Sequence, residues 1–381
     1  MKPLENIKVV SLEQAVAAPM CTRRLVMAGA EVFKIERPSG DFARYYDTSV
    51  AGESAYFVWL NAGKQSVVLN LREDDDLAVL RQLIDRCDVL VQNLKPGALT
   101  ALGIDLAELH VACPGLISVS ISGFHPSGPG AQRKAYDLLM QAESGLADIT
   151  GSAQAPGRVG VSVVDIATGS FAYEAILEAL LVKSQTGQGE RINVSLFDAV
   201  AQWMAVPYLL EKYAEAAPKR VGLAHPGICP YGVFTSADGQ PFVLSIQNER
   251  EWRRLCEVGI HRAELITDGR CTDNETRVKH RGFVDGVLQD VFGRLGYAAV
   301  EQQLGQADLA FAPLNTVAQL KTHADFRTQA VVVGEELIEL PVMPGIAGLS
   351  NAQAPLVVPK LGEHTDKVRT WLRSTQANLG L

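Results

Sequence analysis

The residue in this sequence best placed to do chemistry is Asp165, which separates a β-branched run from an amphipathic segment. The run over 161–164 is largely apolar and β-branched, which is typical of a short strand. After Asp165, apolar side chains recur at helical spacing, as at Ala172, Ile176 and Leu180. We therefore expect Asp165 at the carboxyl end of a strand and at the N-terminus of a helix, where ligands bind in open α/β sheets.

A carboxylate at a helix N-terminus is held ionised by free backbone N–H groups and by the helix dipole, an effect of roughly 0.3–2 kcal/mol. Because free aspartate titrates near pH ~3.9, Asp165 could act as a nucleophile without a base to deprotonate it. The small residues Ala167 and Gly169 would let a bulky group approach closely. The alternative is that Asp165 only caps the helix, which the spacing alone favours because caps are common and nucleophiles are rare. The two roles are compatible.

Length and composition limit the class of protein. The 381 residues are enough for two domains and a sizeable core. The 47% hydrophobic and 20% charged residues are typical of a globular enzyme. The net charge of −8, without a basic block, argues against a nucleic-acid partner. A local group of Arg and Lys could still bind an anionic small molecule.

The cysteines and the N-terminus bear on location. Six scattered cysteines form no C-x-x-C pair, which argues against a zinc site or a disulfide framework and fits a reducing cytosol. Glu5 lies where a signal peptide would be apolar, and no apolar run reaches the ~18 residues that span a membrane. We therefore expect a cytoplasmic protein with no membrane partner and no metal.

Strand-like and helical segments alternate over the first half of the chain. Strands are expected at 7–12, 30–36, 66–70, 88–92, 116–121 and 188–194, and helices at 16–29, 74–87, 99–113 and 195–213. This alternation predicts an α/β fold whose Rossmann-like large domain holds a parallel sheet with right-handed crossovers.

Composition changes beyond this region. We expect the large domain over 1–213 and a linker over 214–230. A smaller α+β domain over 231–325 begins with a hairpin around Asp238-Gly239 and continues mainly as helices. The segment 326–381 holds short strands and a final helix after Glu363.

Glycine patterns exclude two common nucleotide sites. The turn after the first strand has no G-x-G-x-x-G, and the glycine-rich stretch 123–130 does not have P-loop spacing. This weakens the oxidoreductase and NTPase hypotheses.

Cationic side chains follow several of the expected strands. They are Arg37, Arg44, Lys64, Arg72, Lys95 and Lys134. If their loops converge, they form a basic edge suited to a polyphosphate ligand. Taken one at a time, each is more simply a solvated surface charge. The lone His125 is likewise more simply a structural or surface residue than part of a site.

The order and spacing of several short motifs resemble one family over nearly the whole chain. The motifs are 17–19, 29–41, 61–64, 93–97, Tyr136-Asp137, Asp165, 186–189 and 361–366. The family is the class III coenzyme A transferases, which includes formyl-CoA transferase, carnitine-CoA transferase and α-methylacyl-CoA racemase.

The resemblance implies a covalent mechanism. Asp165 would attack an acyl-CoA carbonyl to form an anhydride and later an aspartyl-CoA thioester, from which CoA passes to an acceptor acid. The other implied site residues are Arg37 and Lys134 as CoA contacts, Lys64, Arg72 and Lys95 at the CoA-binding edge, and Tyr136 and Asp137 lining the acyl pocket. Val16 stands where formyl-CoA transferases place a glutamine beside the nucleophile.

The resemblance also implies an assembly and a set of ligands. The fold is an interlocked, ring-like homodimer whose large CoA-binding domain combines the N-terminal part with the C-terminal tail. The CoA thioester is a substrate, so no resident cofactor is expected.

Two departures from the family pattern narrow the activity. Racemases carry a His-Asp pair where this chain has Tyr136-Asp137. A phenol of reference pKa ~10 moves protons poorly near neutrality, which favours a transferase. Formyl-CoA transferases carry a tetraglycine loop, whereas 224–231 holds one glycine, which argues against oxalate and formate as substrates.

The expected activity is therefore transfer of CoA from a donor such as succinyl-CoA to a small carboxylic acid, with a C4–C5 dicarboxylate suggested by the basic edge and the family's range. The alternatives are an α-methylacyl-CoA racemase or epimerase, and a CoA-binding protein without turnover.

Overall fold

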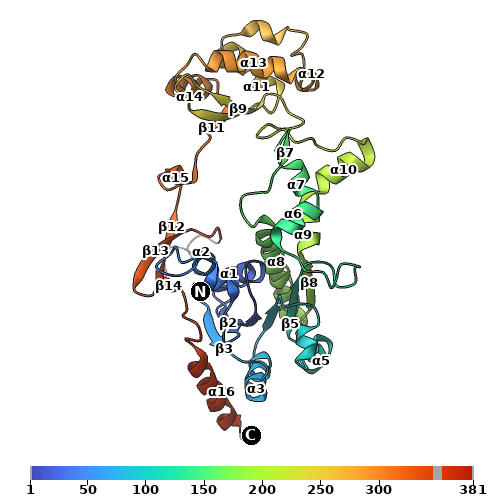
Figure 1. The fold of residues 1–381 in the computed structure, drawn as a ribbon, viewed down its shortest axis with the longest axis vertical. Helices are drawn as coiled ribbons and strands as arrows, with labels where there is room; N and C mark the ends of the chain where they lie inside the picture. The colour runs from blue at the N-terminus through green and yellow to red at the C-terminus, as the bar shows by residue number, and fades with distance from the viewer. Residues whose placement is uncertain (1, 346–353, 380–381) are drawn as a thin grey trace. The chain divides into compact units, whose positions relative to one another are not determined.

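The computed structural model describes residues 2–345 and 354–379 (Figure 1). By its internal contacts the chain divides into two units. Unit 1 comprises Met1–Leu146, Arg158–Val206 and Arg327–Leu381, and unit 2 comprises Ala147–Gly157 and Pro207–Phe326. Residues 147–157, which are expected in the large domain, belong to unit 2 together with the segment from Pro207 onward.

A six-stranded sheet forms the centre of unit 1. Its strands are β1 (Lys8–Leu12), β2 (Glu31–Glu36), β3 (Gln65–Val68), β4 (Val89–Gln92), β5 (Ile117–Ser122) and β8 (Arg191–Ser195). All pairs are parallel, in the order β3-β2-β1-β4-β5-β8, which confirms the predicted α/β fold. The order reverses between β1 and β4, and such a switch point is where ligands bind in open sheets.

Helices cover both faces of this sheet (Figure 1). They are α1 (Ala17–Ala28), α3 (Asp74–Ile84), α4 (Ala98–Ala101), α5 (Leu106–Ala112), α8 (Val163–Thr186), α9 (Leu196–Trp203) and α16 (Thr365–Leu379). Because strand side chains alternate between faces, Val9 packs with α1, α8 and α9, whereas Val10 packs with α3, α4 and α16. Burial on both faces explains apolar runs without alternation such as Val89–Val91 in β4, whereas β5 alternates between apolar residues and serine.

Shorter elements complete unit 1. They are the 3₁₀ turn η1 (Phe42–Tyr45), α2 (Ala55–Asn61), α6 (Asp137–Glu143), β12 (Thr328–Val333), β13 (Glu336–Pro341) and β14 (Leu356–Val357). The last three form a small sheet in the order β13-β12-β14. Short helix α7 (Leu146–Ile149) and the two-residue strands β6 (Gly151–Ser152) and β7 (Ala155–Pro156) follow α6 along the chain.

Unit 2 pairs a small sheet with helices around its own core. Its remaining elements are α10 (Ala205–Ala214), β9 (Tyr231–Thr235), β10 (Pro241–Ser245), α11 (Glu249–Arg254), η2 (Leu255–Gly259), η3 (Ala263–Ile266), α12 (Asn274–Lys279), α13 (Arg281–Phe292), α14 (Tyr297–Gln306), β11 (Ala310–Pro313) and α15 (Val317–Leu320). The predicted hairpin is confirmed as antiparallel β9 and β10, with Gly239 at φ 81° in its turn. Phe234, Phe242 and Trp252 are buried in this core.

Two local predictions are wrong. The expected helix over 195–213 is two helices, because α9 ends before Met204 and α10 begins at Ala205. The expected strand over 161–164 does not form, and α8 instead begins at Val163. Val164 is buried against the sheet core as a helical residue. The weak strand preference of a β-branched run is overridden here by tertiary packing.

Residues 2–345 and 354–379 lack two features. No helix there is both long and apolar enough to cross a bilayer. No group of three or more His, Cys, Asp or Glu side chains is arranged to hold a metal ion.

Candidate active site

Two neighbouring carboxylates with different contacts lie at the N-terminus of α8. Asp165 belongs to α8 itself, and Asp137 belongs to α6. Oδ1 of Asp137 accepts hydrogen bonds from the backbone N–H of Val164 at 2.7 Å and of Asp165 at 3.3 Å. Oδ2 of Asp137 accepts one from the Gln141 side chain at 2.7 Å. The Asp165 carboxylate accepts no hydrogen bond from any residue that the structure describes. Asp137 is therefore the cap of α8, the prediction of a capping role for Asp165 is wrong, and the Asp165 side chain is left available.

The surroundings of Asp165 disfavour its ionised form. Burial, and secondly the negative charge of Asp137, raise the pKa of Asp165 from 3.8 to about 7. The helix dipole is expected to hold this carboxylate ionised, but burial and the like charge shift its pKa in the opposite direction. The dipole effect is small, whereas a buried charge beside a like charge is strongly disfavoured. Burial and the neighbouring charge thus favour the protonated form of Asp165 over the reactive ionised form.

A row of aromatic rings lies near Asp165. The rings of Phe42 and Tyr46 are 5.8 Å apart between centroids, those of Tyr46 and Tyr56 5.5 Å, and those of Tyr56 and Trp59 6.3 Å. Burial, and secondly the charges of Asp41 and Asp165, raise the pKa of Tyr46 from 10.0 to about 12. The Tyr46 hydroxyl therefore lies within electrostatic reach of Asp165 and stays protonated, so it can donate a hydrogen bond in the site.

Val16 lies beside the same helical turn. It is buried in a small apolar cluster with Met20 and Leu60, and Ile166, the neighbour of Asp165, packs against this cluster. Helices α1 and α8 approach closely, because a Cβ at Gly169 would lie 2.5 Å from the carbonyl oxygen of Ala17. The structure thus brings Val16 close to the Asp165 turn, as the sequence analysis expects.

The predicted pocket residues Tyr136 and Asp137 differ in exposure. Tyr136 precedes α6 and is 63% exposed. Asp137 is buried and engaged by the helix cap. Tyr136 is therefore free to contact a ligand, whereas the oxygens of Asp137 already have partners.

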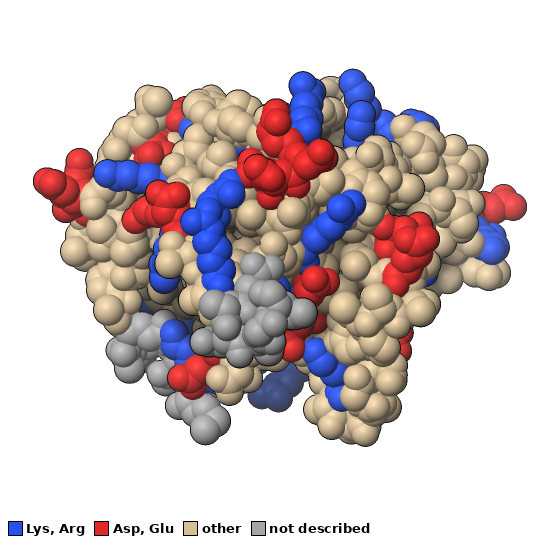
Figure 2. Space-filling view, turned by 90° about the horizontal axis from the view of Figure 1, so that it is seen from below, with Lys and Arg blue, Asp and Glu red and all other residues tan. Residues whose placement is uncertain are grey.

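Four of the predicted cations lie in segments that follow strands of the sheet. Arg72 follows β3, Arg37 follows β2, Lys95 follows β4 and Lys134 follows β5, and all four are exposed. Because the strands are parallel, their carboxyl ends share one edge of the sheet. We define these four residues as the basic edge. On the face drawn in Figure 2, basic and acidic side chains are interspersed among other residues, without a large field of one sign.

The comparisons with known proteins agree with this arrangement. A family model described as CoA-transferase family III matches residues 4–365. The chain belongs to CoA-transferase family III. Proteins of this family transfer CoA, so the chain is an enzyme of that kind.

Similar proteins span almost the full length of this transferase. It is 32% identical to the acetyl-CoA:oxalate CoA-transferase of Acetobacter aceti over 98% of this chain and 97% of that protein. It is 31% identical to the succinate–glutarate CoA-transferase of Agrobacterium fabrum over 98% and 96% of the two chains. A crystal structure of a CAIB/BAIF family protein from Brucella suis aligns with a TM-score of 0.84, at 30% identity, over 97% of this chain and 99% of that one.

The prediction that Lys64 lies on the CoA-binding edge of this transferase is wrong. Lys64 is 2% exposed, and its ammonium group donates to Glu13 at 2.6 Å, to Asn61 at 3.1 Å and to the carbonyl of Pro19 at 3.2 Å. Burial lowers the pKa of Lys64 to about 8, although Glu13 opposes this shift. A buried ammonium beside a buried carboxylate is a structural ion pair.

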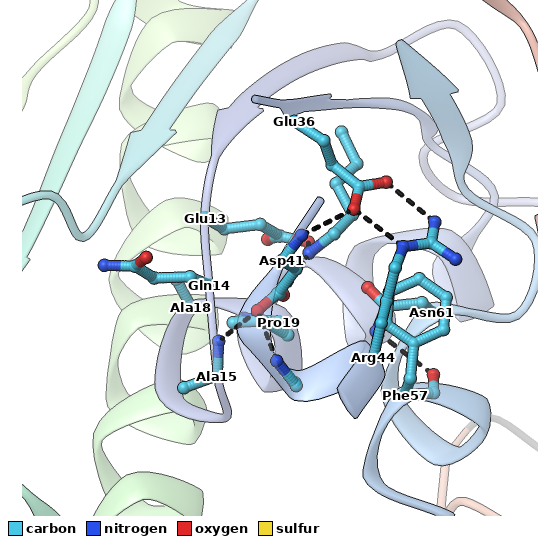
Figure 3. A network of polar contacts seen from close by, with 12 residues as sticks. Glu13, Gln14, Ala15, Ala18, Pro19, Glu36, Asp41, Arg44, Phe57 and Asn61 are labelled. Atoms are coloured by element: carbon cyan, nitrogen blue, oxygen red, sulfur yellow. Dashed lines mark hydrogen bonds and ion pairs between the residues drawn. The ribbon is translucent and has the colours of Figure 1, made fainter. Parts of the chain in front are cut away.

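Arg44, another of the predicted cations, is buried. Its guanidinium donates twice to Glu36, at 2.8 Å from Nε and from Nη2, and lies 3.7 Å from the ring centroid of Phe57 (Figure 3). The expectation that Arg44 contributes to a basic edge is therefore wrong.

These buried charges hold the loop that precedes α1. Oδ1 of Asp41 accepts from the backbone N–H of Ala15 at 3.2 Å, and Oδ2 accepts from Lys34 at 2.8 Å (Figure 3). Ala15 has φ 63°, a left-handed conformation that needs such support. Burial opposes the charge of Glu13, but Lys64 and Lys34 outweigh it and lower its pKa to about 2. The network fixes the backbone next to Val16.

Sequence reasoning missed Tyr46 and Tyr56 in this transferase. A usable signal was the pair Tyr45-Tyr46 directly after the motif over 29–41 that carries the family resemblance. His125 is exposed and contacts the hydroxyl of Ser127 at 2.8 Å, which confirms its interpretation as a local surface residue.

Proposed function

We propose that this family III enzyme moves CoA from an acyl-CoA donor such as succinyl-CoA to a C4–C5 dicarboxylate through a covalent intermediate on Asp165. The observation that carries the proposal is that the two carboxylates at the N-terminus of α8 have different hydrogen-bond partners. Asp137 caps the helix, so Asp165 is left without a partner among the described residues. Similar proteins are named for transfer from succinyl-CoA to glutarate, to D-citramalate and to L-malate.

The steps exchange bonds without net uptake of protons. A carboxylate oxygen of Asp165 attacks the thioester carbonyl, the C–S bond breaks, and CoA leaves as a thiolate. The thiolate then attacks the aspartyl carbonyl of the resulting anhydride, which releases the donor acid and leaves an aspartyl-CoA thioester. The acceptor carboxylate attacks the carbonyl of this thioester, the C–S bond breaks, and CoA leaves as a thiolate from a second anhydride between Asp165 and the acceptor. The thiolate then attacks the acceptor's carbonyl of this anhydride, which forms the new acyl-CoA and frees the Asp165 carboxylate. A covalent carboxylate thus replaces one difficult exchange by easier steps.

The surrounding side chains support these steps. The raised pKa of Asp165 marks a poorly solvated carboxylate, whose ionised form is available above about pH 7. Tyr46 keeps its proton and is suited to donate to an oxyanion that forms beside Asp165. The basic edge is suited to the phosphates of CoA. The chemistry calls for no resident cofactor and no metal.

A labelling experiment tests the intermediate. The enzyme is incubated with succinyl-CoA, reduced with borohydride and digested. The mass of the peptide that contains Asp165 is then measured by mass spectrometry. We expect a modified Asp165 in the wild type and in Glu174→Gln, which alters an exposed acid on the same helix. An unmodified peptide, together with full activity of Asp165→Ala, would eliminate the covalent mechanism.

Two further assays on the same enzyme distinguish a transferase from a racemase or epimerase and from a protein that only binds CoA. A racemase or epimerase would exchange the α-proton of an acyl-CoA into deuterated water without any acceptor acid. A protein that only binds CoA would thioesterify no acid in a panel offered with succinyl-CoA and acetyl-CoA. We expect no exchange, and transfer to at least one dicarboxylate.

We also propose that the enzyme works as a homodimer. Helix α10 has no buried residue, and it exposes five large apolar side chains: Val206, Tyr208, Leu209, Leu210 and Tyr213. Apolar surface gathered on one helix is typical of a face that a second protein covers. A second copy of this chain is the occupant that the family resemblance suggests. A cytoplasmic location stays a prediction.

A further inference from the structure

Unit 1 contains a cavity of about 330 Å³ whose lining is positively charged. Its walls come from α1, α2 and α8 on one side and from β12, β13 and residues 342–344 on the other. Arg23 and Arg24 line it, and none of its lining residues is acidic. The volume lies within the range of about 300–1,000 Å³ that is usual for small-molecule sites.

Arg23 is the most unusual residue of the cavity. It is 1% exposed and takes part in none of the ion pairs between described residues. Its Nη1 donates to the carbonyl of Ala62 at 3.2 Å and to the sulfur of Met27 at 3.0 Å, whereas its Nε has no partner among the described residues. A guanidinium buried without an anion is costly, so a site built this way favours an anionic occupant.

The charge of Arg23 persists at neutral pH. Burial lowers its pKa only to about 10. The neighbouring Arg24 lies 4.2 Å from the ring centroid of Tyr173, which holds its guanidinium in place. Trp59 and Met20 add apolar surface to the same cavity. A carboxylate satisfies the donors of a guanidinium with two parallel hydrogen bonds, and a short hydrocarbon part would contact the apolar wall.

We propose that this cavity binds a small organic acid, with a carboxylate on Arg23 and the hydrocarbon part against Trp59 and Met20. The cavity adjoins the candidate active site, because Trp59, Met20 and Ile166 belong to one apolar cluster. Ser170, which also lines the cavity, follows Asp165 by five residues, or about 7.5 Å along α8. The acid is therefore assigned as the acceptor, and this assignment rests on the proposed function.

Binding is measured on the full-length Asp165→Asn protein without CoA, so that no transfer chemistry contributes. Glutarate is titrated by calorimetry, with sodium sulfate as the inorganic comparison. We expect one glutarate site per chain, at least tenfold weaker binding in Arg23→Met, and unchanged binding in Arg86→Met, which lies before β4 at the other edge of the sheet. Trp59→Phe should remove the change in tryptophan fluorescence that glutarate causes.

Equal binding of glutarate by Arg23→Met, or no binding by either protein, overturns the inference. Sulfate that binds as tightly as glutarate overturns the assignment to an organic acid. If Arg23→Met does not fold, Arg24→Gln tests the same cavity and should weaken glutarate binding at least threefold. Unchanged affinity in that variant counts against the proposal.

Transfer assays on the otherwise wild-type enzyme then separate the two proposals. Arg23→Met should raise KM for the acceptor at least tenfold and leave labelling of Asp165 by succinyl-CoA unchanged. Labelling that fails in every variant defeats the proposed function but leaves the binding result standing. An unchanged KM for the acceptor, with normal labelling, defeats the assignment of the cavity to the acceptor.

Discussion

Asp137 and Asp165 both lie at the N-terminus of α8, but their carboxylate oxygens have different surroundings. Those of Asp137 accept the N–H groups of the first turn of α8 and the amide of Gln141. Those of Asp165 are left desolvated next to a like charge. A nucleophile gains from this contrast, because the residue that stabilises the helix is not the one that has to react.

We expect Asp165→Asn to abolish CoA transfer and to stabilise the folded protein at pH 8. Between pH 3.8 and about 7 the native carboxyl binds more protons than the unfolded one, so the stability of the wild type falls as pH rises through this window. An asparagine escapes this penalty, and the gain should be on the order of 1–3 kcal/mol at pH 8 and smaller at pH 5. Urea unfolding at both pH values checks this. A gain that is equal at both would contradict the assigned pKa.

Tyr46→Phe removes the hydroxyl near Asp165 but keeps the ring against Tyr56. Because a lost oxyanion donor costs roughly 10²–10³ in rate, we expect kcat to fall by at least tenfold with little change in KM for acyl-CoA. The matched control is Tyr45→Phe, whose hydroxyl donates only to the carbonyl of Ser39. Steady-state kinetics should show normal turnover in the control. Normal turnover in both variants would exclude Tyr46 as a donor.

At the scale of elements, the site depends on contacts between segments that are distant in sequence. Helix α8 begins where it does because a residue of α6 caps it, 27 positions earlier for Val164. The loop between β1 and α1 is held by Asp41, which follows β2. Paired buried charges such as Glu13 and Lys64 fix these junctions, and the loss of one partner from such a pair typically costs 3–5 kcal/mol.

The basic edge carries a prediction about CoA. We expect Lys134→Ala and Arg37→Ala each to raise KM for acyl-CoA severalfold with a smaller effect on kcat, because exposed cations in the segments after β5 and β2 would contact phosphates before and during the reaction. The effect should weaken as salt is added. Arg86→Ala, at the opposite edge of the sheet, serves as the control. Loss of kcat without a change in KM would argue against phosphate binding.

At the scale of the whole molecule, the chain contributes to each unit more than once. Unit 1 is assembled from three segments and unit 2 from two. The C-terminal segment returns to unit 1, where α16 packs against α3 and β3 through Val368 and Leu372. The core of unit 1 therefore depends on distant parts of the chain, whereas the core of unit 2 comes from residues 229–311.

The exposed face of α10 carries the prediction about assembly. We expect sedimentation velocity to report a dimer for the wild type and a shift toward monomer for Leu209→Glu combined with Tyr213→Glu, because charges on an apolar contact face disfavour association. Val111→Glu, at a more exposed apolar position on α5, should leave the dimer intact. A wild type that sediments as a monomer at micromolar concentration would refute the proposal.

Patterns along the sequence determined most of the α/β sheet, the hairpin of unit 2 and the choice of Asp165, because strands, turns and motifs depend on neighbouring residues. Only the tertiary structure decided which carboxylate caps α8, why Lys64 and Arg44 are buried, and that Tyr46 lies near Asp165. Burial and charge pairing depend on residues far apart in the chain. For that reason, the same lysine pattern predicts a surface cation at Lys134 and at Lys64, and only the folded chain distinguishes the two.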